Sequence, residues 1–178
     1  MNTRLIHRRA ASPTRDLAAC IEGMLAAELL CPGKNIMVVS PWMSDFAALD
    51  NRGGQFTAIE QSWVATMVPF SAVLRSLLAR GVDVRLACGP GERESELVDR
   101  LSQGAALDGT TDQLETVRLS QNRKVFSHEK ALVADSWAIY GSMNLTKSGV
   151  SMNGELITVT TDSTMVTTVS TELRGLFA

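Results

Sequence analysis

A short run of apolar residues, 35–40 (NIMVVS), constrains the fold most. The run is continuous and does not alternate with polar residues, which is typical of a strand buried on both faces. A stretch with helical spacing of apolar residues precedes it at 14–30, and Pro32-Gly33 ends that helix. A second helix at 69–80, ended by Gly81, and a strand at 82–89 repeat the pattern. This rhythm predicts an α/β fold whose mixed, mostly parallel sheet has helices on both faces.

The other elements expected from the sequence extend this pattern to the end of the chain. A helix at 92–102 and a polar loop from Gly104 to Thr111 come first. Strands are then expected at 115–120, 124–135, 137–142 and 154–162, with a turn at 121–123, a turn or short helix at 144–149 and a closing helix at 165–177. The irregular stretch from Ser44 to Trp63, with a turn at 50–54, has the length of a functional or mobile loop.

The length of 178 residues favours a single domain, 1–178. Residues 1–11 are expected to be a flexible basic tail that includes His7, and Ser12-Pro13 is expected to begin the first helix.

The composition limits the classes of protein to which the chain can belong. A hydrophobic content of 45%, a mean hydropathy of +0.06 and a net charge of −2 are typical of a globular chain that is not basic overall. A nucleic-acid partner would therefore need a local cationic patch. No stretch approaches the length of a membrane span, and no secretory signal is evident, so we expect a cytoplasmic protein.

The three cysteines form no C-x-x-C pair, and the chain has only two histidines, so neither a metal site nor a cofactor is expected. Cys20, Cys31 and Cys88 are interpreted as reduced thiols in the core.

Chemistry-bearing residues gather between Ser127 and Glu155. His128 and Lys130 stand two apart in a predicted strand, which places both side chains on one face. An imidazole beside an ammonium, with no carboxylate on that face, suits a phosphate site better than a core. Asp135 follows. A Gly-Ser-x-Asn run then contributes Ser142 and Asn144, and Glu155 comes last.

This order resembles the signature of the phospholipase D superfamily, H-x-K-x4-D followed by G-S-x-N, and in particular its small single-motif, nuclease-like members. The resemblance implies a phospholipase D-like fold and phosphoryl transfer without a metal through a covalent phosphohistidine on His128. Lys130 and Asn144 would act on the phosphate oxygens, and Glu155 would accept a hydrogen bond from the far ring nitrogen of His128. Asp135 would hold the motif without taking part in the chemistry.

Ser142 would bind substrate through its hydroxyl group, and Trp42, just after the first buried strand, could stack on a base. Purely structural interpretations remain open at several of these positions. Trp42 could instead plug the edge of the core, the residues from Gly141 to Asn144 could cap a short helix, and Glu155 could lie on a solvated strand face. Four loop cations could follow a phosphate backbone or be ordinary surface residues. They are Arg52, Arg123, Lys124 and Lys147.

The function expected from these residues is that of a metal-independent phosphodiesterase, a hydrolase that cleaves DNA or RNA. One H-x-K motif supplies one histidine, and the mechanism uses two, so a homodimer that shares its active site is expected. One alternative is a non-catalytic nucleic-acid-binding subunit of a DNA-modification or phage-defence complex, and another is a phospholipid phosphodiesterase. Membrane insertion is not expected.

Overall fold

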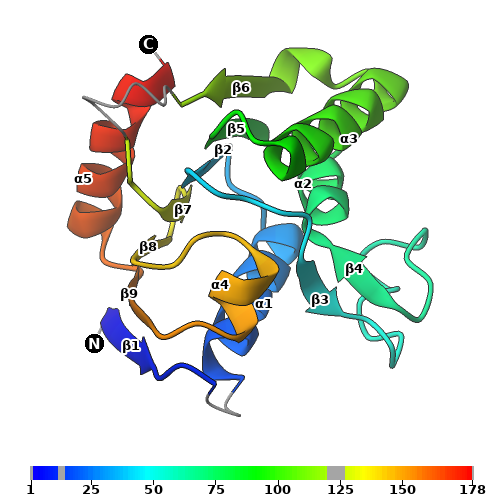
Figure 1. Ribbon diagram of the computed structural model, residues 1–178. Coiled ribbons are helices and arrows are strands. Elements are labelled where there is room, and N and C mark those ends of the chain that lie inside the picture. The colour runs from blue at the N-terminus through cyan, green and yellow to red at the C-terminus, as the bar shows by residue number, and fades with distance from the viewer. Residues whose placement is uncertain (1, 12–14, 120–126, 178) are drawn as a thin grey trace.

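The fold is built on a seven-stranded sheet with the order β1-β9-β8-β7-β2-β5-β6 (Figure 1). The computed structural model describes residues 2–11, 15–119 and 127–177. The strands of this sheet are β1 (Thr3–Arg8), β2 (Asn35–Ser40), β5 (Asp83–Cys88), β6 (Leu114–Arg118), β7 (Ala131–Ala134), β8 (Ala138–Gly141) and β9 (Glu155–Thr160). A separate two-stranded sheet pairs β3 (Ala47–Asp50) with β4 (Met67–Pro69).

Five α-helices accompany the strands within the described residues. They are α1 (Asp16–Leu30), α2 (Phe70–Leu78), α3 (Glu92–Asp108), α4 (Lys147–Ser151) and α5 (Ser163–Arg174), with short 3-10 turns at Thr111–Gln113 and Gly175–Phe177. No helix in the part of the chain that the structure describes is long and apolar enough to cross a membrane.

The sheet is mixed, as predicted, but the expectation that it is mostly parallel is wrong. Only β2 with β5 and β5 with β6 pair in parallel among the described strands. The pairs β1–β9, β2–β7, β7–β8 and β8–β9 are antiparallel. The βαβ rhythm therefore holds from β2 to β6, whereas β7, β8 and β9 follow one another along the chain as antiparallel neighbours.

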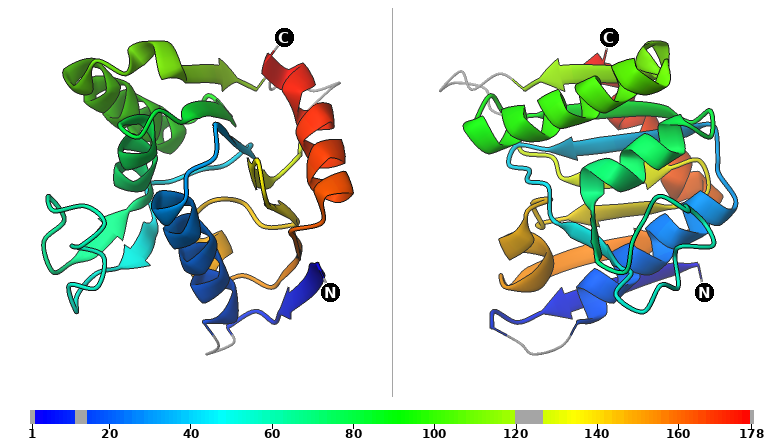
Figure 2. Two further views of the ribbon diagram at one scale, coloured as in Figure 1. Left: turned by 180° about the vertical axis from the view of Figure 1, so that it is seen from behind. Right: turned by 90° about the vertical axis from the view of Figure 1, so that its right-hand side faces the viewer.

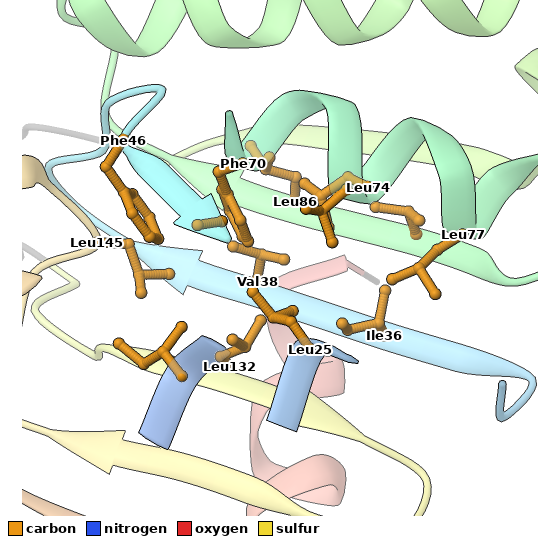
Figure 3. Close-up of a cluster of buried hydrophobic side chains, with 14 of the residues drawn as sticks. Leu25, Ile36, Val38, Phe46, Phe70, Leu74, Leu77, Leu86, Leu132 and Leu145 are labelled. Atoms are coloured by element: carbon orange, nitrogen blue, oxygen red, sulfur yellow. The ribbon is translucent and has the colours of Figure 1, made fainter. Parts of the chain in front are cut away.

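Helices cover both faces of the sheet, as predicted (Figure 2). On one face, α1, α2 and α3 pack on the larger part of the core (Figure 3). On the other face, α5 packs through Val166 and Leu173. The side chains of β2 divide between the two cores, with Ile36 and Val38 in the first and Met37 and Val39 in the second. This division explains why the sequence of β2 is apolar without alternation.

Helix α3 is longer than the sequence suggests. The predicted loop at Gly104 to Thr111 is wrong at its start, because Gly104 is buried in the helix. A Cβ atom at Gly104 would lie 2.9 Å from Cδ of Arg75 on α2, so this glycine serves close helix packing. The helix ends instead at Gly109, whose φ of 70° is left-handed.

The N-terminal segment is also not a flexible tail. Thr3–Arg8 forms β1, the edge strand, and pairs with β9 from Thr3 opposite Thr160 to Arg8 opposite Glu155. His7 is an exposed member of this strand. Two further expectations, the Ser12-Pro13 helix start and the turn at 121–123, lie outside the described residues. Cys88 is buried, but Cys20 is only partly buried and Cys31 is exposed, so the core interpretation fails for Cys31.

Candidate active site

The ends of four adjacent strands bring the candidate residues to one edge of the sheet. Val39 near the end of β2 lies opposite Ala131 at the start of β7, and Ala131 lies opposite Tyr140 near the end of β8. Gly141, the last residue of β8, lies opposite Ile157 near the start of β9. The residues that follow β2 and β8, and those that precede β7 and begin β9, therefore surround one site.

His128 and Lys130 lie just before β7, not within it as predicted, yet their side chains meet. Nζ of Lys130 is 2.9 Å from Nδ1 of His128 and donates to the His128 carbonyl oxygen at 2.7 Å. His128 is exposed, whereas Lys130 is only 6% exposed. With Lys130 protonated, Nδ1 must accept the hydrogen bond, because an ammonium only donates.

Burial also changes the acidity of Lys130. Desolvation of its ammonium lowers the pKa of Lys130, and the nearby charges of Glu155 and Glu129 oppose this shift without cancelling it. The site therefore holds a cation that is poorly hydrated, and such a cation interacts strongly with an incoming phosphate.

Ser142 and Glu155 form a fixed pair beside this cation. The Ser142 hydroxyl donates to Oε2 of Glu155 and accepts from the backbone N–H of Leu156 at 3.0 Å. Glu155 is 7% exposed, so the solvated-face interpretation is wrong. Gly141 makes the arrangement possible, because its φ of 148° is unfavourable for other residues and a Cβ would lie 2.4 Å from the Leu156 carbonyl oxygen. The contact expected between Glu155 and His128 stays a prediction.

Asn144 lies beside Ser40 at the end of β2, whose hydroxyl is 2.8 Å from the Trp42 carbonyl oxygen and 3.3 Å from Oδ1 of Asn144, so the two acceptors share one donor. An amide that accepts through Oδ1 keeps its two donors on Nδ2, the atom expected to reach a phosphate. The following helix, α4, is capped by Thr146 and not by the Gly-Ser-x-Asn residues, because its Oγ1 accepts from the N–H of Gly149. A Cβ at Gly149 would lie 2.0 Å from the Asn144 carbonyl oxygen, so this glycine lets α4 pack against the site.

Trp42 lies at the site and is not part of the buried core. Its ring meets that of His128 edge to face, with centroids 5.7 Å apart and an interplanar angle of 84°. The side chain is 46% exposed, so a ligand can reach it. Base stacking on Trp42 stays a prediction.

Two residues that support the site were missed in the sequence. Glu94 in the first turn of α3 is buried, and its Oε1 accepts from the backbone N–H of Met43 at 2.9 Å, which fixes the loop that carries Trp42. Arg8 at the end of β1 is 4% exposed and donates to the carbonyl oxygens of Gly149, Val150 and Asn153 around the end of α4. Both residues contact segments that are far away in the chain, so no local sequence pattern predicts these contacts.

The other candidates are separate from this cluster. Asp135 accepts from the backbone N–H groups of Lys34 and Asn35, at the opposite end of β2, which agrees with a structural role. Arg52 is paired with Asp50, which lowers the pKa of Asp50 to about 2, chiefly through their side-chain hydrogen bond. Arg123 and Lys124 lie outside the described residues. Among the residues that are described, no group of three or more His, Cys, Asp or Glu side chains is placed to hold a metal ion.

Comparison with known proteins agrees with this fold. Residues 56–177 match the family described as the PLD-like domain of cardiolipin synthase. No curated protein matches the chain significantly.

Several solved structures are similar to the chain. Nuc from Salmonella typhimurium, a phospholipase D family member, is 12% identical with a TM-score of 0.59, and the match covers 98% of this chain and 92% of that one. NucT from Helicobacter pylori is 12% identical with a TM-score of 0.58, and the match covers 98% and 94%. Phosphatidylserine synthase from Haemophilus influenzae is 16% identical with a TM-score of 0.62, but the match covers only 38% of that chain and 97% of this one. These likenesses concern the fold, whereas the family match spans most of the chain, including the His-x-Lys and Gly-Ser-x-Asn residues, and the chain therefore belongs to the phospholipase D superfamily.

Proposed function

We propose that the chain is a phosphodiesterase that cleaves nucleic acid through a covalent phosphohistidine on His128, without a metal ion. The observation that carries the proposal is the contact between the buried ammonium of Lys130 and the exposed ring of His128. This pair presents a nucleophile and a poorly hydrated cation to the same space, and Asn144 adds amide donors.

The proposed reaction has two displacements at phosphorus. Nε2 of His128 attacks, the bond from phosphorus to the leaving oxygen breaks, and a second histidine, as imidazolium, protonates that oxygen. Water then attacks the phosphohistidine, the P–N bond breaks, and the second histidine takes the proton from water. With Nδ1 accepting from Lys130, the neutral ring carries its proton on Nε2, so the attack requires the other tautomer. A phosphate oxygen would draw Lys130 away from Nδ1, and the ring proton would then pass through solvent from Nε2 to Nδ1, which donates to Glu155 and leaves the lone pair of Nε2 for the attack.

The second histidine in this proposal is His128 of a second copy of the chain. His7, the other histidine, lies on β1 opposite Leu156, and its side chain is exposed on the edge strand. A two-fold axis beside the site would place both copies of His128 about one phosphate.

The main alternative substrate is a phospholipid, which the names of the matching family and of phosphatidylserine synthase suggest. Size favours a nucleic acid, because the chain matches almost all of Nuc and NucT but a minor part of the synthase. Resemblance to the compact nuclease-like members supports the same choice.

The test is hydrolysis in EDTA of a chromogenic phosphodiester, of labelled single-stranded DNA and RNA, and of phosphatidylglycerol vesicles. His128→Ala should abolish hydrolysis, and His7→Ala, the matched control, should retain it. A labelled substrate should leave on the wild-type protein a phosphate adduct that is stable in alkali and lost in acid, as expected of a P–N bond.

Activity that is lost in EDTA and restored by a divalent ion would show that the mechanism is wrong. Hydrolysis of vesicles but of neither nucleic acid would leave the lipid alternative.

A further inference from the structure

A cleft separate from the catalytic edge lies between α1, α4 and the β3–β4 sheet, with a volume of about 880 Å³. Helix α1 contacts both α4 and β3, which Figure 1 shows beside it. Three exposed cations from three different elements reach the cleft: Arg15 before α1, Arg93 in α3 and Lys147 in α4. We call this the cationic cleft.

The cationic cleft is a neighbour of the catalytic edge, and the same backbone segments contribute to both. Ser44, in its lining, is two residues from Trp42, and its hydroxyl accepts from the backbone N–H of Lys147. Lys147 in turn is three residues from Asn144. The backbone N–H of Ser44 donates to the carbonyl oxygen of Leu145, so the two walls are joined where the site ends and the cleft begins.

The charge of the cleft is positive although the chain is acidic overall. Its lining contains one acid, Asp45, whose carboxylate is already bound by Arg100 at 2.6 Å and by the hydroxyl and backbone N–H of Ser71. Arg93 and Lys147 form no ion pair within the described residues.

Arg15 is only loosely paired. It lies 3.9 Å from Asp50, and Asp50 is held more closely, at 2.6 Å, by Arg52. The side chain of Arg15 is 65% exposed, so the pair contributes little and Arg15 can change partner.

Separate cations on three elements fit a ligand with phosphates at intervals. A strand of nucleic acid has such phosphates along its whole length, whereas the headgroup of phosphatidylglycerol has one phosphate. We propose that the cationic cleft binds the phosphate backbone of a single nucleic-acid strand and leads it to the catalytic edge. This inference rests on the proposed function and extends it, because it assigns the binding of the flanking strand to Arg15, Arg93 and Lys147.

The experiment measures binding by fluorescence anisotropy to a labelled oligothymidylate across a salt titration, in the His128→Ala background so that no cleavage occurs. The double variant R93Q/K147Q is compared with K34Q/R174Q, a charge-matched control that also removes two positive charges, from exposed residues just before β2 and in α5. Thermal unfolding of each variant verifies that the fold is kept. Turnover of the chromogenic phosphodiester is measured with the same substitutions in protein that retains His128.

Each phosphate contact on a single strand contributes about 0.7 to the slope of log affinity against log salt, so the double variant should lower the slope by about 1.4. When the salt concentration is raised from 50 to 200 mM, the affinity of the double variant should fall less than the affinity of the parent. The ratio between the two losses should be roughly sevenfold. K34Q/R174Q should match the parent, and turnover of the chromogenic substrate should be unchanged by R93Q/K147Q, because that substrate occupies the catalytic edge alone.

Four results would overturn the inference: no binding of the oligonucleotide by the parent, an unchanged slope in R93Q/K147Q, an equal change of slope in K34Q/R174Q, or, with phosphatidylglycerol vesicles as an additional probe, loss of vesicle binding in R93Q/K147Q while its oligonucleotide binding is intact. Because binding is read without cleavage, these outcomes are separate from a failure of the proposed hydrolysis, which the chromogenic substrate reports.

Discussion

Replacing Lys130 by methionine should move activity and stability in different directions. The side chain is buried, and desolvation lowers the pKa of Lys130, so the folded protein disfavours its charge relative to water. Methionine fills a similar volume without that charge. We therefore expect Lys130→Met to lose activity but not stability.

The two effects are comparable in magnitude but differ in sign. Removing one donor that stabilises transition-state charge typically costs about a hundredfold to a thousandfold in rate, or roughly 3–4 kcal/mol in activation free energy. Replacing a buried charge by an apolar group of similar volume is often neutral or stabilising, by about 1–4 kcal/mol in favourable cases. Two effects reduce the gain in the free energy of unfolding here. The substitution removes the hydrogen bond to the His128 carbonyl oxygen, and it removes the favourable interaction with the charge of Glu155.

The sign of the pH dependence follows from the lowered pKa. Between the folded-state pKa of Lys130 and its ordinary value of 10.5, the unfolded chain binds more protons than the folded chain. The free energy of unfolding of the wild-type protein should therefore rise with pH in that window relative to Lys130→Met, with a slope of at most about 1.4 kcal/mol per pH unit for one proton. Below the folded-state pKa the difference should be constant.

The assay is urea unfolding at a series of alkaline pH values, followed by turnover of the chromogenic phosphodiester. Lys34→Met is the matched control for the substitution, because Lys34 is exposed and lies just before β2, at the end opposite to the site, so its turnover should equal that of the wild type. The reasoning is refuted if the difference between wild type and Lys130→Met is flat or falls as the pH rises through this window.

Three further predictions concern the site and its supports. A dimer with one wild-type and one His128→Ala chain should be nearly inactive if one phosphate is shared, and a half-active hybrid that does not exchange subunits would contradict the shared site. Gly149→Ala should cost about 1–3 kcal/mol in urea unfolding and reduce turnover, because its Cβ would press on the Asn144 carbonyl oxygen, whereas Gly23→Ala, with nothing within 4 Å, should stabilise α1 by roughly 0.5–1 kcal/mol. Trp42→Ala should weaken binding of oligonucleotides by about 1–3 kcal/mol if a base stacks there, and an equal loss with the chromogenic substrate would argue against stacking.

The strands whose local sequence matches their surroundings could be predicted from the sequence. Asn35–Ser40 is buried on both faces and is apolar throughout, so its pattern is unambiguous. The strand direction in the second half of the sheet was mistaken, although the chain holds a clue. Only Asp135 to Trp137 separate β7 from β8, which is too short for the crossover that parallel strands need. Edge strand β1 gave a weak pattern because it pairs on one side only.

The candidate site was accessible to sequence reasoning where its residues stand close together in the chain. His128 and Lys130 come just before the β7–β8 hairpin, and Ser142 and Asn144 come just after it, so the pairing of the two strands brings them together. Glu94 comes from a helix distant in sequence, and its role depends on a single contact with the loop that carries Trp42. Such a role emerges only from tertiary packing.

The position of β9 between β1 and β8 has a consequence for synthesis on the ribosome. Strand β1 leaves the ribosome well before its partner, and it stays unpaired until residues 155–160 have followed it. Until then β1 exposes its hydrogen-bonding groups, and the guanidinium of Arg8 lacks the carbonyl oxygens of 149–153. Nascent chains should therefore keep β1 open to chaperones and proteases until β9 has been synthesised, and the wall of the catalytic edge to which β9 contributes should form late in folding.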